Sequence, residues 1–302
     1  MILRTSAMKK LSILIPTYNH DCVLLVDAMV EQIGSTGVEA EIIVLDDGSS
    51  DMRVLAENAS IEQTEHCRYI VSAVNRGIAV TRNSLIDAAT GDHLLFMDSD
   101  TYPAEDDFLQ RYVAAAGEAD VVVGGLKFRS GEEQVSNPLR LRYGQHAECR
   151  SVRRRERNPY DAFLSSCFMI SKEATKKVRF DETFDRYGHE DTLFGAALQQ
   201  AGVTIKHIDA PVFHDNTDTS EQYLSKVRIA IQSLSMHADK LRGHSRLLRL
   251  YDVIESFHLT RFVYSAFGHF RGAMEKNLTG KHPLMSILKL YKISYLCGVM
   301  KL

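Results

Sequence analysis

The sequence has no run of about 18 consecutive apolar residues, which a membrane-spanning helix of the usual kind requires. Residues 1–10 carry charge at both ends and lack an apolar segment, so a secretory signal peptide is not expected. The five cysteines are scattered and lack metal-type spacing, which argues against a metal or disulfide framework. A formal net charge of −3 argues against nucleic acid as a partner. We therefore expect a cytoplasmic protein with reduced thiols, and peripheral contact with the inner face of a membrane stays open.

The chain alternates short apolar runs with helical patterns over its first 125 residues or so. Near-continuous apolar strands separated by helices indicate βαβ units and a mostly parallel sheet buried on both faces. After an irregular segment, a strand is expected at Ala162–Ile170, a helix near Thr192–Ala201 and a strand at Val203–Ile208. The pattern turns helical from Glu221 to the end of the chain. The strands predicted within the first 125 residues are Leu11–Ile15, Glu41–Leu45, Cys67–Ala73, His93–Met97 and Val121–Val123.

The most informative motif is Asp98-Ser99-Asp100, which directly follows the apolar run His93–Met97. A strand that ends in Asp-x-Asp places both acids at the carboxyl edge of the sheet, where open α/β sheets bind ligands. Two close carboxylates repel each other, and a cation between them and a substrate removes that repulsion. A divalent metal with a diphosphate fits this requirement, although an isolated motif of this kind is more often a solvated acidic turn.

Two further motifs follow the first two predicted strands. Pro16 fixes the exit of the first strand, and Thr17, Tyr18 and Asn19 follow it, offering a hydroxyl group and an aromatic face to a base. Asp46-Asp47 ends the second strand, where a carboxylate can accept a hydrogen bond from a base ring. Ser50 or Asp51 caps the next helix in either reading. Ordinary turn residues remain an equal alternative for the first motif.

Three more segments carry chemistry-bearing side chains. Asn75-Arg76-Gly77 precedes a helix that bears Arg82, and an arginine at such a place can meet a phosphate or lie on the surface. Glu190 and Asp191 open another helix, where paired acids suit the helix dipole or supply a general base. His214 follows an apolar strand, and a lone histidine of this kind is usually structural.

Taken together and in this order, the motifs resemble those of the family 2 glycosyltransferases with the GT-A fold, over residues 10–216. The matching segments are S-I-L-I-P-T-Y-N at 12–19, V-L-D-D-G-S-S-D at 44–51, N-R-G-I-A-V-T-R-N at 75–83, F-M-D-S-D at 96–100 and G-H-E-D at 188–191. The resemblance implies a Rossmann-like α/β fold with a mostly parallel central sheet, flanked by helices and followed by a C-terminal helical extension. Residues 1–219 are then the nucleotide-sugar-binding and catalytic domain, and residues 220–302 serve packing, dimerisation or membrane-surface contact.

The resemblance also implies roles for single positions. Asp191, with Glu190 beside it, is the expected catalytic base. Asp100 is the expected metal ligand, with His214 as a second ligand and Asp98 at the metal or the ribose. Mn²⁺ or Mg²⁺ is the expected cofactor, and an imidazole ligand favours Mn²⁺. The expected nucleotide-sugar-binding residues are Pro16, Thr17, Tyr18, Asn19, Asp47, Asn75, Gly77, Arg82, Asp98 and Ser99.

These roles define an inverting, metal-dependent transfer of one sugar, of the hexosyl or N-acetylhexosaminyl type. The donor is a nucleoside-diphosphate sugar, with a UDP-sugar as the default, and the acceptor is a hydroxyl group of a sugar or lipid-linked molecule in surface polysaccharide or glycolipid assembly. Family members that build polymers processively often carry Gln-x-x-Arg-Trp, and this chain has no tryptophan. The alternative is a catalytically silent nucleotide-sugar-binding protein of the same fold. A sugar nucleotidyltransferase is disfavoured, because no glycine-rich loop follows the first strand.

Two segments of the chain are rich in basic residues. Residues 127–160 are irregular, and we expect a mobile loop there. Its arginine-rich part, residues 140–157, either clamps an anionic acceptor or is merely solvated. Residues 240–302 carry eleven basic residues against three acidic ones, a net charge of +8, with aromatic and aliphatic residues between them. Basic amphipathic helices suit an anionic membrane surface. Packing on the catalytic domain or on a second subunit of a homodimer is the alternative.

Overall fold

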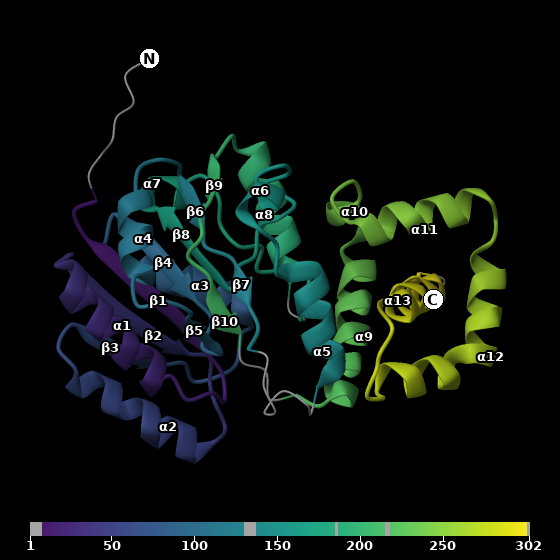
Figure 1. The fold of residues 1–302 in the computed structure, drawn as a ribbon, viewed down its shortest axis with the longest axis horizontal. Coiled ribbons are helices and arrows are strands. Elements are labelled where there is room, and N and C mark those ends of the chain that lie inside the picture. The colour runs from purple at the N-terminus through teal and green to yellow at the C-terminus, as the bar shows by residue number, and fades with distance from the viewer. Residues whose placement is uncertain (1–7, 130–136, 185–186, 215–217, 301–302) are drawn as a thin grey trace. The chain divides into compact units, whose positions relative to one another are not determined.

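A computed structural model describes residues 8–129, 137–184, 187–214 and 218–300 of the chain (Figure 1). It divides into two compact units. The first unit comprises residues 1–127, 149–185 and 194–215, and the second comprises residues 128–148, 186–193 and 216–302. The predicted boundary between residues 219 and 220 stays a prediction.

The first unit is built on a mostly parallel sheet. Among the described residues this sheet has the strand order β3-β2-β1-β4-β8-β6-β9, and β8 runs antiparallel to both of its neighbours. A small sheet in the order β5-β10-β7 accompanies it. The strands are β1 (Leu11–Thr17), β2 (Ala40–Asp46), β3 (Cys67–Val71), β4 (His93–Met97), β5 (Thr101–Pro103), β6 (Val121–Val123), β7 (Leu126–Lys127), β8 (Cys167–Ser171), β9 (Ile205–His207) and β10 (Val212–His214).

Helices cover both faces of the large sheet, as the apolar strands require. Ile13 of β1 packs in one cluster with residues of α1 and α4, while Leu14 packs on the other face with residues of α3 and α8. Burial on both faces explains why these strands are apolar at consecutive positions. The helices of this unit are α1 (Val23–Thr36), α2 (Met52–Asn58), the short 3₁₀ helix η1 (Ala59–Gln63), α3 (Ile78–Ala88), α4 (Phe108–Ala115), α6 (Val152–Arg155), α7 (Lys172–Thr175) and most of α8 (Glu190–Gln200).

The second unit is helical in its described part. Figure 1 shows α13 along its axis, with α9, α11 and α12 on different sides of it. Tyr291 and Leu296 of α13 are fully buried, which is expected of a central helix. No helix of the described residues is long and apolar enough to cross a membrane. The elements are α5 (Pro138–Tyr143), one π-helical turn η3 (Gly144–Glu148), the first turn of α8, α9 (Ser220–Met236), α10 (Ala238–Leu241), α11 (Arg246–Ser256), α12 (Thr260–Leu278) and α13 (Met285–Val299).

The prediction of a strand over Ala162–Ile170 is wrong in its first half. The strand β8 begins only at Cys167, and the chain before it is irregular. Phe163 is nonetheless buried, and its ring lies 5.0 Å from that of Phe168. A run of apolar residues indicates burial, but it does not distinguish a strand from a packed turn.

The prediction of a mobile loop in the arginine-rich segment is also wrong for its described part. Helices α5 and α6 lie there, and Arg140 and Arg155 are buried. Within the second unit, Arg140 pairs with Glu148 at 2.9 Å and lies over the ring of Phe128. Residues 130–136 lie outside the described residues. These two arginines stabilise the fold. Only the other arginines of the segment are left for the predicted binding of an anionic acceptor.

Arg155 contacts four groups of the first unit that lie in β6 and β9 or directly after them. Its Nη1 donates to Val123 O and lies 2.9 Å from His207 Nδ1, and its Nη2 donates to Gly124 O and Ile208 O. We expect Arg155→Met to lower the free energy of unfolding by about 2–3 kcal/mol, because buried carbonyls lose charge-assisted donors. Urea unfolding measures this loss. The adjacent Arg154 is exposed, and an equal loss in Arg154→Met would contradict the account.

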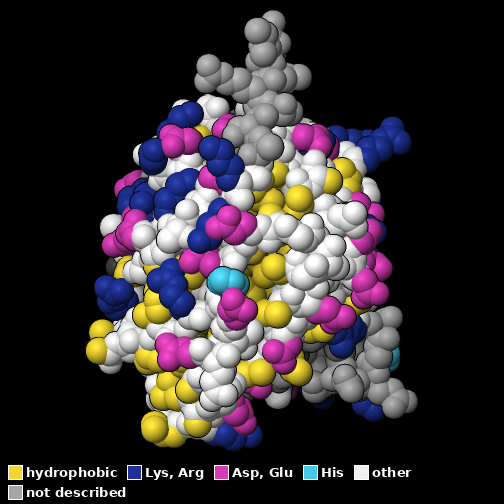
Figure 2. Space-filling view, turned by 90° about the vertical axis from the view of Figure 1, so that its left-hand side faces the viewer, with side chains coloured by type: hydrophobic (Ala, Val, Ile, Leu, Met, Phe, Trp, Pro, Cys, Tyr) yellow, Lys and Arg dark blue, Asp and Glu magenta, His cyan; other side chains and the backbone are white. Residues whose placement is uncertain are grey.

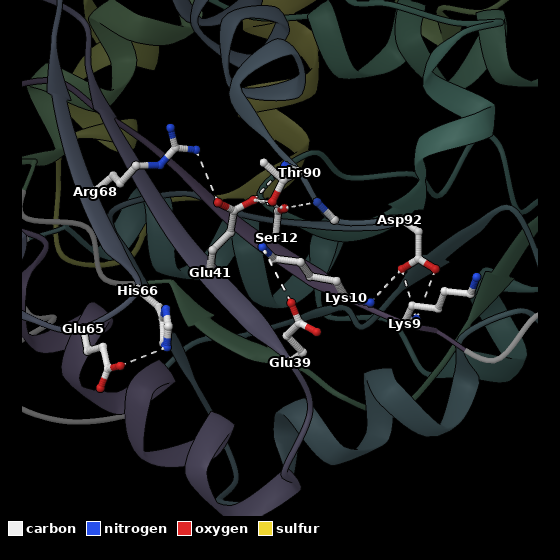
Figure 3. A network of polar contacts seen from close by, with 11 residues as sticks. Lys9, Lys10, Ser12, Glu39, Glu41, Glu65, His66, Arg68, Thr90 and Asp92 are labelled. Carbon is white, nitrogen blue, oxygen red and sulfur yellow. Dashed lines mark hydrogen bonds and ion pairs between the residues drawn. The ribbon is translucent and has the colours of Figure 1, made fainter.

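A second polar network joins strands β1 and β2 to the end of α3 (Figure 3). Glu41 accepts hydrogen bonds from Ser12 Oγ at 2.7 Å and from both the N–H and the hydroxyl of Thr90, and it pairs with Arg68 at 3.3 Å. Burial alone raises the pKa of Glu41, but the hydrogen bonds and the arginine outweigh it, so that the pKa is lowered. The ionised carboxylate therefore stabilises the fold.

We expect Glu41→Gln to lower the free energy of unfolding by about 1–2 kcal/mol at neutral pH. Because the folded-state pKa is lowered, this contribution is present above the ordinary carboxyl pKa and is lost as pH falls below about 4. Urea unfolding at both pH values measures the change. Glu39→Gln is the control, since Glu39 is 72% exposed and lies 3.9 Å from Lys10. A Glu41→Gln loss that does not shrink in acid would contradict this assignment.

Candidate active site

The carboxyl ends of β1, β2 and β4 place most of the predicted site residues at one edge of the large sheet. Thr17 pairs in register with Asp46, and Leu14 pairs with Phe96, two residues before Asp98. Ligands of open α/β sheets bind at this edge. The predicted mostly parallel sheet is therefore confirmed, while the ligand-binding role of each residue stays a prediction.

Asn19 joins the loop after β1 to the loop after β2. Its backbone N–H donates to Ser49 Oγ, and its Oδ1 accepts from the N–H groups of Ser50 at 2.9 Å and Asp51 at 3.0 Å. Its φ of 50° is left-handed, a conformation that asparagine tolerates better than most residues. Asp51 in turn caps α2 by accepting from Arg53 N. Asn19 thus holds the two loops together.

The residues beside Asn19 differ in exposure. Pro16 is buried within β1, and the Thr17 hydroxyl donates to His20 O at 2.9 Å. Tyr18 is 49% exposed. Its ring therefore offers the open aromatic surface that a nucleobase can stack on.

The two acids after β2 have separate partners. Asp46 accepts from Ser49 N and from the hydroxyl of Tyr69, whereas Asp47 accepts from Arg76 N at 3.0 Å and Gly77 N at 2.8 Å. Asp47 therefore fixes the segment that opens α3, where Asn75 is exposed and Gly77 has a φ of 91°. The sequence alone did not reveal Tyr69 as a partner, since it lies inside a strand as an ordinary core residue.

Arg82 and Asp98 form an ion pair in which Arg82 is buried and Asp98 is 26% exposed. Arg82 Nη2 lies 2.8 Å from Asp98 Oδ1, and the side chain of Arg82 is 2% exposed. Its guanidinium also lies 5.2 Å from the ring centre of Phe180. Burial raises the pKa of Asp98 and the neighbouring charge of Asp100 adds to the rise, although Arg82 opposes it. Additional positive charge near Asp98 would therefore lower the cost of keeping its carboxylate ionised.

Asp100 and His214 face each other beside that pair. His214 lies in β10, which pairs with β5 so that His214 is opposite Thr101. Its Nε2 lies 3.6 Å from Asp100 Oδ2, and Ser99 between the two acids is partly exposed. The described residues contain no group of three or more acids, histidines and cysteines that could hold a metal. A carboxylate and an imidazole fit a divalent cation whose remaining ligands are diphosphate oxygens and water.

Glu190 and Asp191 open α8 and belong to the second unit. Asp191 accepts from Thr192 N, and Glu190 accepts from Gly188 N at 3.1 Å. Gly188 has a φ of 102°, and a Cβ there would lie 2.6 Å from Ala230 Cβ, so only glycine fits. This turn before α8 is thus sterically fixed.

Between these residues, His189 also has a left-handed φ of 72°. Burial lowers the pKa of His189 to about 4, and the charge of Lys292 adds to the shift. The imidazole is therefore neutral at physiological pH. The structure brings Arg82 to Asp98 and Asp100 to His214 within the first unit, and it holds Glu190 and Asp191 in the turn of the second.

The first unit thus combines an open α/β sheet, with acidic side chains at its carboxyl edge, and a small accompanying sheet. Residues 12–179, more than half of the chain, match the family model described as Glycosyl transferase family 2. The chain belongs to this family, so the predicted family and fold are confirmed.

Two curated relatives show the extent of the likeness. The uncharacterized glycosyltransferase YfnE of Bacillus subtilis is 34% identical over 244 residues, 65% of this chain and 62% of that protein. The amylovoran biosynthesis glycosyltransferase AmsB of Erwinia amylovora is 26% identical over 196 residues, 61% of this chain and 63% of that protein. The chain spans less than two thirds of the length of each of these two relatives.

Two solved structures share the fold. The mannosyltransferase PcManGT of Pyrobaculum calidifontis, in complex with GDP-Man and Mn²⁺, has a TM-score of 0.58 at 13% identity, covering 98% of this chain and 87% of that one. TarS of S. aureus has a TM-score of 0.52 at 18% identity, covering 97% of this chain and 55% of that one.

Proposed function

We propose that the chain transfers a single sugar from a nucleoside-diphosphate sugar to a hydroxyl acceptor, with inversion at the anomeric carbon and with a divalent metal. The observation that carries this proposal is the pair of contacts at the sheet edge, Arg82 with Asp98 and Asp100 with His214. Together they combine a buried cation with two ligand types for a metal. Such a set suits a diphosphate, which needs its negative charge neutralised as it leaves.

The nucleoside would lie over the loops after β1 and β2. Tyr18 supplies an exposed ring for stacking, with Thr17 and Asn19 beside it. Each Asp47 oxygen already accepts one backbone N–H and retains a lone pair for a base N–H. A carboxylate acceptor is compatible with uracil, so a UDP-sugar is the default donor. Asn75 and Gly77, in the segment that Asp47 holds, and Ser99, in the Asp-x-Asp turn, are further proposed nucleotide-sugar-binding residues.

Asp100 and His214 would hold the metal, with Asp98 at the ribose or the metal. Mn²⁺ is favoured over Mg²⁺ by the imidazole nitrogen. A bound divalent ion supplies Lewis-acid stabilisation of the diphosphate leaving group. The mannosyltransferase with a similar fold was solved with GDP-Man and Mn²⁺, which supports a metal of this type here.

Asp191 would act as the general base for the acceptor hydroxyl. Its carboxylate lies in the first turn of α8, where the helix dipole favours the ionised form that can take a proton. Glu190 supports this role by holding the turn through Gly188 N. Direct displacement with one base inverts the anomeric centre and requires no enzyme nucleophile.

The acceptor is proposed to be a sugar or a lipid-linked sugar in the assembly of a surface polysaccharide or glycolipid. Curated relatives include a poly(ribitol-phosphate) beta-glucosyltransferase of Bacillus spizizenii and the amylovoran biosynthesis protein AmsB, which supports this class of acceptor. A cytoplasmic location with peripheral contact at the inner membrane face is part of the proposal, and so is a homodimer.

The test combines donor binding with product analysis. Thermal shift with UDP, GDP, dTDP and CMP, each with and without Mn²⁺, identifies the donor base. NMR of the product formed from the matching donor then reports the anomeric configuration. We expect metal-dependent stabilisation by one nucleoside diphosphate, followed by an inverted product. A retained configuration would overturn the inverting mechanism, and binding without any transfer would point to the silent nucleotide-sugar-binding alternative.

A further inference from the structure

Helices α11 and α12 of the second unit are largely uncovered. Among the described residues of α12, only Phe267 and Leu278 are buried, although the helix spans 19 residues. In α11 only Leu248 and Tyr251 are buried. Helices of this length in a packed unit usually bury a wider stripe than this.

The contacts of α12 fix which of its faces is turned inward. The ring centre of Phe267 lies 5.2 Å from that of Tyr291 in α13, and Glu275 accepts a hydrogen bond from the Tyr291 hydroxyl at 2.8 Å. Glu275 also pairs with Arg228 of α9 and Arg271 of α12. The opposite face of α12 carries Phe262, Ala266, Phe270 and Ala273, at the spacing of one helix side.

Large apolar side chains are exposed on this face and on the adjoining α11. Phe262 is 72% exposed and Phe270 is 60% exposed, and Phe257 at the end of α11 is 69% exposed. Leu250 and Val253 precede Phe257 at helical spacing and are about half exposed. We call these five residues, with the exposed cations described next, the α11–α12 surface.

Basic side chains outnumber acidic ones among the exposed residues of these two helices. The acids of the two helices are each engaged within the second unit: Asp252 with Arg242, Glu255 with Tyr251 and Glu275 with the residues named above. The exposed cations Arg249, Arg261 and Lys276 have no ion pair among the described residues. By contrast, basic and acidic side chains are mixed on the face of the molecule shown in Figure 2.

We propose that the α11–α12 surface binds the surface of an anionic phospholipid bilayer. Phenylalanine and leucine side chains enter the boundary between headgroups and acyl chains, while arginine and lysine reach the phosphates above them. Each cation near such a membrane contributes about 1 kcal/mol of attraction. A second copy of the same surface would bring like charges together, which disfavours a symmetric dimer here. This inference assigns a surface to the membrane contact that the proposed function includes, and vesicle binding tests it separately from glycosyl transfer.

The test is sedimentation of the full chain with two kinds of vesicle. One contains phosphatidylcholine alone, and the other contains equal parts of phosphatidylcholine and phosphatidylglycerol. We expect binding to the second kind only, weakened by high salt, because the Debye length shortens. Equal binding to both kinds, or no binding to either, would overturn the proposal.

Two sets of variants locate the surface. The triple variant R249Q/R261Q/K276Q is expected to lower partitioning onto anionic vesicles by roughly a hundredfold. Its matched control is K9Q/R53Q/K177Q, which removes three exposed cations of the first unit. Equal losses in both triple variants would show attraction by general charge and contradict the assigned surface.

The apolar contribution has its own pair of variants. F262S/F270S is expected to lower partitioning by roughly tenfold or more, since two exposed rings no longer enter the bilayer. L24S/M52S is the control, because Leu24 is 74% exposed and Met52 is 75% exposed in the first unit. Sedimentation velocity without lipid supplies the remaining outcome: a dimer that F262S/F270S converts to a monomer would identify a subunit interface and overturn the membrane assignment.

Discussion

Replacement of Asp191 by asparagine is expected to lower kcat for sugar transfer by a factor of about 10²–10⁴, with little change in KM for the donor. The amide keeps the size of the side chain and can still accept the hydrogen bond from Thr192 N. It cannot take the proton of the attacking hydroxyl. Steady-state kinetics with the identified donor measures this change.

The neighbouring acid is the matched control. Glu190→Gln retains an oxygen that can accept from Gly188 N, so the turn before α8 is preserved. If Asp191 is the base, Glu190→Gln loses much less of kcat than Asp191→Asn. The reverse order, with activity kept in Asp191→Asn and lost in Glu190→Gln, would assign the base to Glu190.

Arg82→Met is expected to lower the free energy of unfolding by about 3 kcal/mol, because it leaves Asp98 without its cation in a largely buried place. We also expect the variant to lose metal-dependent binding of the nucleoside diphosphate. Arg82 holds down the pKa of Asp98, so removing it raises that pKa further. The loss of stability should therefore shrink as pH falls and Asp98 takes a proton.

A double-mutant cycle isolates the pair. Asp98→Asn in the Arg82→Met background should recover part of the lost stability, since the buried negative charge is removed. Arg76→Met serves as the control, because Arg76 is an exposed arginine six residues away on the preceding loop. A loss in Arg76→Met equal to that in Arg82→Met, or no recovery in the double variant, would contradict the assignment of this ion pair.

The strands of the large sheet could be predicted closely from the sequence. The predicted span His93–Met97 is the observed β4, and Val121–Val123 is the observed β6, because consecutive apolar residues reflect burial on both faces. Since the carboxyl ends of parallel strands share one edge, the meeting of Thr17, Asp46 and Asp98 could be predicted as well.

Other features depend on contacts that no local pattern encodes. Arg154 and Arg155 are adjacent and chemically identical, yet only Arg155 meets the carbonyls of β6 and is buried. The pairing of β5 with β10, which sets His214 beside Asp100, was likewise not predicted as a sheet. Strands of three residues carry too little periodicity to be recognised.

The exposure of the C-terminal helices could not be predicted either. Tyr291 and Phe270 both belong to the basic, aromatic segment, but Tyr291 is fully buried and Phe270 is 60% exposed. Only the packing of α12 on α13 distinguishes these two aromatic residues.

The central claim is that the sheet edge binds a nucleoside diphosphate through a metal held by Asp100. Isothermal titration of UDP, and of the base selected by thermal shift, in the presence and absence of Mn²⁺ tests it most directly. We expect tight binding only with Mn²⁺, abolished in Asp100→Asn and retained in Asp27→Asn, which alters an exposed acid of α1. Binding that is the same with and without Mn²⁺, or unchanged in Asp100→Asn, would contradict it.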